Sequence, residues 1–479
     1  MRTRAPKYLM GAALGAGLAT ALIGGTAFAE GEDPVAVLGT QTNLLWVIIG
    51  AVLVIFMQAG FALVETGFTQ KKNAAEVMST NFAIFGLGFV GFLFVGFPLA
   101  FAGFGTSLLG LTPMNGSGLP AVSIGGNNGG IFYWGYSHLG NAATPALLGF
   151  FLYMVAFMDT TATIPTGSMA ERWKWKSFCW WGLFCGSIYY PLFAAWTWGG
   201  GWLAKTWSSM HFGAGYVDFA GSGVVHTAGG VAALAGAIVL GPRIGKYGPD
   251  GKPRAIPGHN IPMAMLGCFI LLFGWFGFNA ASTFAVTDIQ FSTVAANTAI
   301  AAAVGATFAL YYITWRTGKP DPGMMVNGML AGLVGITAPC AFVAPWAAAA
   351  IGAISALIAI EAVFFLDKRG VDDPVGAIAV HGFAGTFGVL AVGIFANGKY
   401  GGAWNGSTST GVKGIIEGDW GQLAAQALGA LVLWTVIFGL AFGFFKLQNK
   451  ITKGGIRSPE ADEIAGLDIP EMGVMGYTD

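Results

Sequence analysis

The chain has 479 residues, of which 55% are hydrophobic and only 10% are charged. Soluble domains usually carry about 25% charged residues, so this composition excludes an ordinary water-exposed globular domain. Lys and Arg together number 23, as do Asp and Glu, so the basic excess of a nucleic-acid-binding protein is absent.

The first thirty residues have the layout of a secretory signal peptide. Three basic residues lie within the first seven, residues 8–23 are apolar and small, and an Ala-Phe-Ala sequence ends at Ala29 before acidic residues. We predict cleavage after Ala29, so that residues 1–29 form a signal peptide. The alternative is an uncleaved first membrane helix.

Eleven apolar segments follow, and each is long enough to supply the roughly 20 residues of helix that cross a hydrocarbon core about 30 Å thick. They span residues 44–64, 79–104, 141–170, 177–198, 222–240, 261–284, 292–315, 324–342, 346–366, 377–396 and 422–447. We therefore predict an all-α integral membrane protein with eleven transmembrane helices within residues 30–451. Residues 452–479 would form a polar tail.

Basic residues fall on alternate loops between these segments. After residue 29, seventeen Lys and Arg lie in the odd-numbered loops and the tail, whereas three lie in the even-numbered loops. Cytoplasmic loops are enriched in Lys and Arg, so this distribution places the N-terminus outside and the C-terminus in the cytoplasm of a multi-pass cell-membrane protein. The assignment fails if the helix count is wrong by one.

Two of the five histidines lie inside apolar segments, each after a valine. His226 is in VVHTAGG of the fifth segment, and His381 is in AVHGFAG of the tenth. This similarity suggests two inverted five-helix repeats followed by a final helix, an arrangement found in transporters.

An imidazole in hydrocarbon is costly unless it has a partner. Such a histidine therefore lines a cavity or conduction path, or it is a structural histidine bonded across helices. Two neutral imidazoles in contact can share a proton, because each has one donor and one acceptor nitrogen. No Cys, Asp or Glu joins His226 and His381 at metal-ligand spacing, so we predict no metal site.

Aromatic residues gather toward the predicted outer ends of the segments. Trp198 ends the fourth segment, Phe157 lies in the third, and Phe278 lies in GWFGFNAAS of the sixth. A ring face attracts a cation by about 0.5–2 kcal/mol. For any single ring, an interfacial belt or plain packing is the alternative. Ser282, four residues after Phe278, shares its helix face and could accept a hydrogen bond from a cation held by Trp198.

Two acidic residues lie beside or inside these segments. Asp218 opens the fifth segment, where a carboxylate caps a helix and complements its dipole; it would also bias a nearby site toward cations. Asp159 lies within the third segment, and we expect it to face a water-filled vestibule or to be paired.

These motifs resemble the ammonium transporter (Amt/Mep/Rh) family, specifically its Amt branch. The similarity runs over residues 44–468 and includes, in the family's order, GFALVETGFTQKKNAAEVMSTNF, GSMAER, DFAGSGVVH, GWFGFNAAS and VDDPVGAIAVHG. It implies an eleven-helix protomer, a homotrimer with a separate pore in each protomer, and no cofactor.

The resemblance also implies roles for individual residues. By motif position, Trp198, Phe157 and Ser282 would form an external recruitment site for NH4+, supported by Asp218. Phe157 and Phe278 would form a gate below this site.

Below the gate, His226 and His381 would be the paired pore histidines of the family. NH4+ would lose its proton near the gate, NH3 would pass the narrow apolar pore, and the proton would follow separately by way of the histidines. A full charge in a dry pore is costly, whereas neutral ammonia is not. Potassium has no proton to surrender, so such a pore would reject it.

Several positions depart from the family pattern. Tyr153-Met154 stands where many members have Phe-Gln, which predicts a different affinity of the outer site. Asp159 occupies a position that is usually apolar, and Gly376 stands where some members place an acid. The tail ends in MGVMGY at Tyr477 and lacks a common His-Gly pair. The glycine at position 376 leaves open one proton route of the family. The different tail end leaves open whether a cytoplasmic PII signal protein regulates the chain.

Other functions remain as alternatives. An ammonium sensor would need an output, and sensors of this kind usually carry an added cytoplasmic domain. A channel for another small solute, such as carbon dioxide or a methylated amine, is the second alternative. An enzyme is the weakest, because we find no nucleophile–base pair, metal set or phosphate loop.

Overall fold

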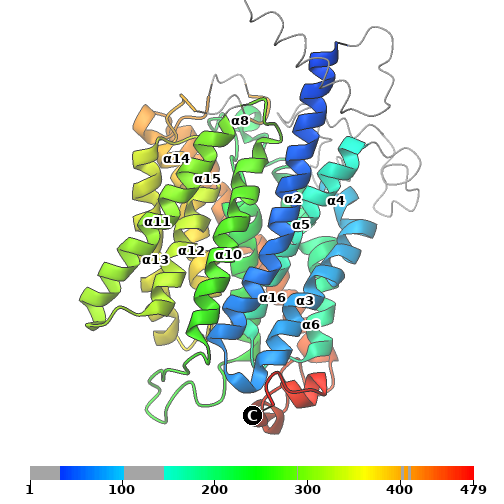
Figure 1. The fold of residues 1–479 in the computed structure, drawn as a ribbon, viewed down its shortest axis with the longest axis vertical. Coiled ribbons are helices and arrows are strands. Elements are labelled where there is room, and N and C mark those ends of the chain that lie inside the picture. Colours follow the sequence, from blue (N-terminus) through cyan, green and yellow to red (C-terminus); the bar gives the residue numbers. More distant parts are fainter. Residues whose placement is uncertain (1–32, 102–144, 289, 401–403, 408–410, 479) are drawn as a thin grey trace, which may run out of the picture.

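The computed structural model describes residues 33–101, 145–288, 290–400, 404–407 and 411–478. Within these ranges the chain folds into helices and loops, with isolated β-bridges in place of a sheet. Most helices run along one common direction and form a bundle (Figure 1). The predicted all-α fold is therefore confirmed for these residues. The predicted signal peptide lies outside them.

Helices occupy all eleven apolar segments. The first five contain α2 (Pro34–Phe68), α3 (Ala74–Gly91) with η2 (Phe92–Gly96) and α4 (Phe97–Phe101), α5 (Pro145–Met169), α6 (Trp175–Phe184) with η3 (Cys185–Tyr189) and α7 (Tyr190–Trp196), and η4 (Ser222–Thr227) with α9 (Ala228–Leu240). The other six contain α10 (Ile261–Asn279) with η5 (Ala280–Thr283), α11 (Gln290–Thr317), α12 (Pro322–Thr337), α13 (Pro345–Lys368), η6 (Ile378–Phe383) with α14 (Ala384–Phe395), and α15 (Trp420–Val432) with η8 (Leu433–Ile437) and α16 (Phe438–Ile451).

Short helices lie between these segments or in the tail. They are η1 (Lys71–Asn73), α8 (Thr206–Ser209), η7 (Ile415–Glu417), α17 (Glu460–Ala465) and η9 (Asp468–Met472). In the described part of the chain, nine helical runs are long and apolar enough to cross a membrane. The two other apolar segments are α12, with 16 residues, and the run from α6 to α7. The chain is therefore a multi-pass membrane protein, whereas the count of eleven spans remains a prediction.

Small residues let the long helices α2 and α10 pack closely. A methyl group added at Gly60 would lie 2.7 Å from Leu271 Cγ, and one at Gly267 would lie 2.7 Å from the Gly60 carbonyl oxygen. A side chain at Gly60 would therefore have to displace Leu271, and one at Gly267 would have to shift the α2 backbone. Close approach of this kind is how membrane helices gain van der Waals contact without a hydrophobic driving force.

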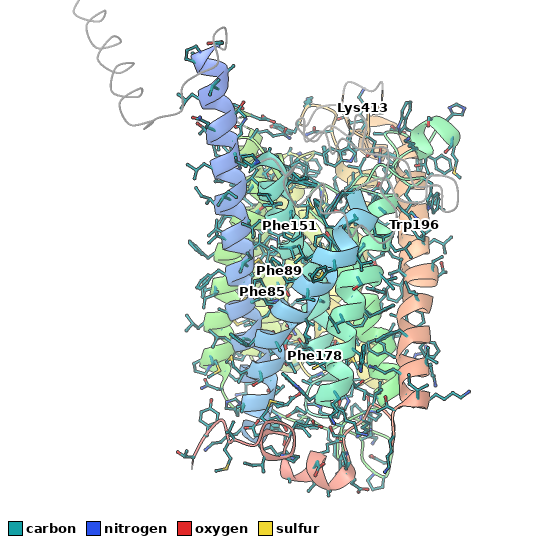
Figure 2. All side chains as sticks on the ribbon, turned by 90° about the vertical axis from the view of Figure 1, so that its right-hand side faces the viewer. Phe85, Phe89, Phe151, Phe178, Trp196 and Lys413 are labelled. Carbon is teal, nitrogen blue, oxygen red and sulfur yellow. The ribbon has the colours of Figure 1, made fainter. Side chains whose placement is uncertain are left out.

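Aromatic side chains fill the space between α3 and α5. The Phe89 ring lies 5.7 Å from the Phe85 ring on the same helix and 5.6 Å from Phe151 of α5, at ring centroids. The second pair meets edge to face, the arrangement that aromatic quadrupoles favour. These three rings lie together in the side view of the bundle (Figure 2).

The two histidine-bearing segments cross inside the bundle. Segment η4, which continues into α9, contacts α14. Segment η6, which continues into α14, contacts α9, so each histidine-bearing turn packs against the helix that follows the other one. A methyl group at Gly230 would lie 2.1 Å from the backbone nitrogen of Gly382, so glycine is required at this crossing. The crossing brings His226 and His381 together.

The tail packs against one end of the bundle, where it is drawn in red (Figure 1). The Arg457 guanidinium pairs with the Glu463 carboxylate at 2.8 Å and donates to the Leu240 carbonyl oxygen at 3.0 Å. The Asp468 carboxylate accepts the backbone N–H of Glu76 at 2.9 Å, near the start of α3. The tail is therefore hydrogen-bonded to the helices that it follows.

Candidate functional site

A histidine pair lies in the interior of the bundle. His226 Nδ1 and His381 Nδ1 are 3.2 Å apart, and the ring centroids are 5.2 Å apart. The two side chains are 0% and 5% exposed. Since one Nδ1 must donate and the other accept, neutral rings in this contact have different tautomers.

Each histidine belongs to a single π-helical turn, η4 or η6. Such turns are rare and occur often at functional sites, because the wider turn changes the direction of a side chain. Among the described residues, no protein atom is hydrogen-bonded to His226 Nε2, although this atom is buried. Within the described part of the chain, one ring nitrogen of His226 is therefore left without a hydrogen-bond partner.

Stacked aromatic rings continue from the histidine pair to one side. The His226 ring stacks on Phe278 at 5.4 Å and on Trp275 at 5.1 Å. Phe278 in turn stacks on Phe157 at 4.1 Å, with 25° between the ring planes. This last separation leaves no room for a solute between the Phe157 and Phe278 rings.

A first cavity lies on the far side of the Phe157 and Phe278 rings. Its volume is about 30 Å³, enough for one or two water-sized molecules. The cavity is lined by Met154, Phe157, Trp198, Phe219, Ser282, Phe284, Trp404 and Asn405. Trp198 meets Phe157 edge to face at 5.8 Å. Three residues predicted for the outer site, Trp198, Phe157 and Ser282, thus share one cavity.

Asp218 is not among the residues that line the first cavity; it caps the start of η4. One carboxylate oxygen accepts the N–H of Gly221 at 2.8 Å, and the other accepts those of Gly223 and Val224 at 2.8 and 2.9 Å. Burial raises the pKa of the Asp218 carboxyl, and these backbone N–H groups lower it. Trp198 Nε1 donates to the Asp218 backbone oxygen at 2.7 Å, which connects the cap to the cavity wall.

Asp373 plays the corresponding part in the second half, and our sequence reasoning missed it. Its carboxylate accepts the N–H groups of Ala377 at 3.0 Å and Ile378 at 2.7 Å, at the start of η6. Burial raises the pKa of Asp373 to about 6, while the backbone N–H groups lower it. The available signal was the spacing, because each aspartate, Asp218 or Asp373, stands eight residues before its histidine.

A second cavity, of about 20 Å³, lies on the other side of the histidine pair. His381 and Phe61 line it, together with the carboxyl-bearing side chain of Glu65. Glu65 accepts hydrogen bonds from Asn81 at 2.6 Å and from Thr166 at 2.9 Å. The first cavity, the phenylalanine pair, the histidine pair and the second cavity therefore follow one another in this order.

Asp159 has a side-chain partner at one carboxylate oxygen, whereas its Oδ1 is buried without a hydrogen-bond partner among the described residues. It is 2% exposed, and Gln58 of α2 donates a hydrogen bond to its carboxylate. Gln58 also donates to Thr163 at 2.7 Å. The residue faces α2, lines neither cavity, and remains without a role in the path.

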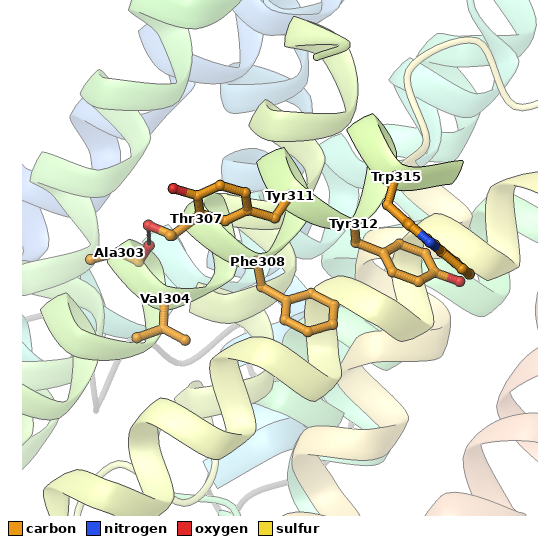
Figure 3. Close-up of a pocket in the computed structure, with 7 residues that line it drawn as sticks. All are labelled: Ala303, Val304, Thr307, Phe308, Tyr311, Tyr312 and Trp315. Carbon is orange, nitrogen blue, oxygen red and sulfur yellow. Dashed lines mark hydrogen bonds between the residues drawn. The ribbon is translucent and has the colours of Figure 1, made fainter. Parts of the chain in front are cut away.

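A larger pocket lies on α11, away from all predicted site residues. Its lining is almost wholly apolar and consists of Ala303, Val304, Thr307, Phe308, Tyr311, Tyr312 and Trp315 (Figure 3). Tyr311 and Trp315 are 71% and 78% exposed, as expected of a surface that faces lipid or another protomer. We therefore do not place a polar substrate there. Within the described residues, no group of three His, Cys, Asp or Glu could hold a metal ion.

Comparison with known proteins gives one family over most of the chain. Residues 45–477 match the family model described as Ammonium Transporter Family. A protein from Archaeoglobus fulgidus named Ammonium transporter Amt2 is 43% identical over 438 residues, which are 91% of this chain and 88% of that protein.

Solved structures give the same result. A protein titled Sensor Amt Protein superposes with a TM-score of 0.77 at 37% identity, over 91% of this chain and 99% of that one. Candida albicans Mep2 superposes with a TM-score of 0.72 at 28% identity, over 88% of this chain and 87% of that one. Both the sequence and the fold therefore match the same set of proteins.

Proposed function

The chain belongs to the ammonium transporter family, and on this premise we propose that it recruits NH4+ at the first cavity, deprotonates it and conducts NH3 past His226 and His381 into the cytoplasm. The proton would move separately by way of the two histidines. The observation that carries this proposal is the unbroken line of contacts from the first cavity through Phe157, Phe278, His226 and His381 to the second cavity.

The first cavity suits a small cation that can donate hydrogen bonds. The Trp198 and Phe157 rings line it, and an aromatic face attracts a cation by about 0.5–2 kcal/mol. Ser282 contributes an oxygen to the lining that can accept a hydrogen bond. Trp198 is hydrogen-bonded to the backbone oxygen of Asp218, and the buried carboxyl of the same residue adds negative potential when it is ionised.

The path below the first cavity suits a neutral molecule. Phe157 and Phe278 close it with apolar surface, so an ion passing between them would lose its hydration with no replacement. Deprotonation removes that cost. Below the rings, the unpartnered Nε2 of His226 can receive a hydrogen bond from ammonia or exchange a proton with it.

We further propose eleven membrane spans as two inverted repeats plus a final helix, with the N-terminus outside. The tail end would be cytoplasmic, because Lys72 and Lys174 from the basic loops hydrogen-bond to tail residues at that end. The protein would lie in the cell membrane as a homotrimer, as the family resemblance implies. The apolar face of α11 is one surface available for lipid or a neighbouring protomer, and the docked tail is a surface that a PII signal protein could meet.

Replacing Trp198 by leucine should raise the ammonium concentration for half-maximal uptake roughly twofold to thirtyfold. This factor corresponds to the loss of one cation–π contact of about 0.5–2 kcal/mol. Initial uptake by proteoliposomes, measured over a range of ammonium concentrations, checks this expectation. Trp180, which is 64% exposed on α6, provides the matched control, because Trp180→Leu should leave half-saturation unchanged. Equal values for intact protein and Trp198→Leu would contradict a recruitment role.

A sensor is the second candidate function, because a structural relative at 37% identity is titled Sensor Amt Protein. A sensor would bind ammonium without moving it across the membrane. Binding to detergent-solubilised protein, measured beside uptake into proteoliposomes, separates the two functions. We expect both binding and uptake; binding without uptake would favour the sensor.

A further inference from the structure

Tyr153 of α5 lies directly behind the first cavity. Its side chain is 0% exposed and does not line the cavity, yet it contacts three residues that do. Its hydroxyl oxygen is 3.1 Å from Ser282 Oγ. Its ring centroid is 4.8 Å from that of Phe157 and 5.1 Å from that of Phe284. One buried side chain thus supports three parts of the cavity wall.

The hydrogen bonds around Tyr153 determine which part of Ser282 faces the cavity. Ser282 donates its one hydroxyl proton to the Phe278 carbonyl oxygen at 2.7 Å, and the Tyr153 hydroxyl lies within reach of both the Gly277 carbonyl oxygen at 2.9 Å and Ser282 Oγ at 3.1 Å. With the Ser282 proton directed toward the backbone, the hydrogen bond between the two hydroxyls takes its proton from Tyr153. Ser282 Oγ then keeps a lone pair for a ligand in the cavity. Such a site favours a cation with N–H donors.

The position of the Tyr153 ring is itself fixed from behind. A methyl group added at Gly50 of α2 would lie 2.8 Å from Tyr153 Cε2. Helix α2 therefore closes the space that the ring would need in order to withdraw from Phe157 and Ser282. In close-packed interiors, a shift of even one methylene is felt by the neighbours.

We propose that Tyr153 is a positioning residue that fixes the Ser282 hydroxyl and the Phe157 ring, and thereby sets the affinity and size limit of the first cavity for ammonium. The inference rests on the proposed function. Methylammonium keeps three N–H donors and can still bind Ser282. Its methyl group, however, requires space that the fixed Phe157 ring does not give. Tyr153 would thus favour ammonium over methylammonium.

The test is initial uptake by proteoliposomes that contain Tyr153→Phe, Ser282→Ala or both substitutions. Loss of one hydrogen bond corresponds to roughly a threefold to tenfold change, so Tyr153→Phe should raise half-saturation for ammonium by about that factor. The maximal rate should stay within about twofold, and the relative rate for methylammonium should rise. Because Tyr153 acts through Ser282, adding Tyr153→Phe to Ser282→Ala should cause little further change in half-saturation for ammonium.

Tyr189→Phe is the matched control. Tyr189 is also 0% exposed, and its hydroxyl donates to the Ala228 carbonyl oxygen at 2.7 Å, away from the cavity lining. Three outcomes would each overturn this inference and leave the proposed function intact. They are unchanged half-saturation in Tyr153→Phe, full additivity of Tyr153→Phe with Ser282→Ala, and an equal shift in Tyr189→Phe. Intact protein without saturable ammonium uptake would overturn the proposed function, and this inference with it.

Discussion

Replacing His226 by leucine should lower the ammonium-driven current at least about 100-fold. This factor is the lower end of what a positioned acid–base group contributes to the rate of a proton transfer. Leucine has a similar volume and keeps the apolar contact with Trp275 and Phe278. It removes both ring nitrogens, so His381 loses its hydrogen-bond partner and the proton loses its path. Current in proteoliposomes at equal protein content measures the effect.

The control for this variant is His211→Asn. His211 is exposed and has a φ of 59°, a left-handed conformation that asparagine tolerates. We expect its current to match that of intact protein. The amount of folded His226→Leu protein, judged by gel filtration in detergent, should also match. Loss of folded protein would instead indicate that His226 is a structural histidine, and an unchanged current would contradict a role in conduction.

Replacing Asp218 by alanine should have the largest effect on folding. The substitution leaves the buried N–H groups of Gly221, Gly223 and Val224 without their acceptors. A buried donor without a partner costs about 1–3 kcal/mol, so three together should lower stability by about 3 kcal/mol or more. The temperature of half-maximal aggregation in detergent should therefore fall sharply, and little protein should be recovered.

Asp321 is the matched control because it also caps a helix N-terminus through its carboxylate, but at a solvent-exposed position. Its carboxylate accepts the N–H groups of Gly323 and Met324 at the start of α12, where water can replace it. Asp321→Ala should cost roughly 1 kcal/mol, the usual value for an exposed N-cap. Equal losses in the Asp218→Ala and Asp321→Ala variants would contradict the buried cap.

Much of the path could be predicted from local sequence. An ionisable residue in an apolar helix is costly enough to stand out, which is why His226 and His381 were found without a structure. Trp198, Phe157 and Ser282 followed from motif positions, and the structure places them around one cavity. Their roles in recruitment are still predictions.

Other features depend on contacts that no local pattern reveals. Trp404 and Asn405 line the first cavity from a loop more than a hundred residues after Ser282. Tyr153 looked like a simple departure from a family pattern, and only its distances to Ser282 and Phe157 show that it supports the wall. The tail was expected to be a polar extension, whereas Arg457 and its neighbours bind it to the bundle.

The central claim is selective conduction of ammonium with a separate proton, and the current from purified protein in proteoliposomes tests it most directly. An ammonium jump should give a saturable inward current, and a potassium jump of the same size should give none. Ammonium uptake without current would contradict the proton path through His226 and His381. An equal current with potassium would contradict deprotonation at the phenylalanine pair.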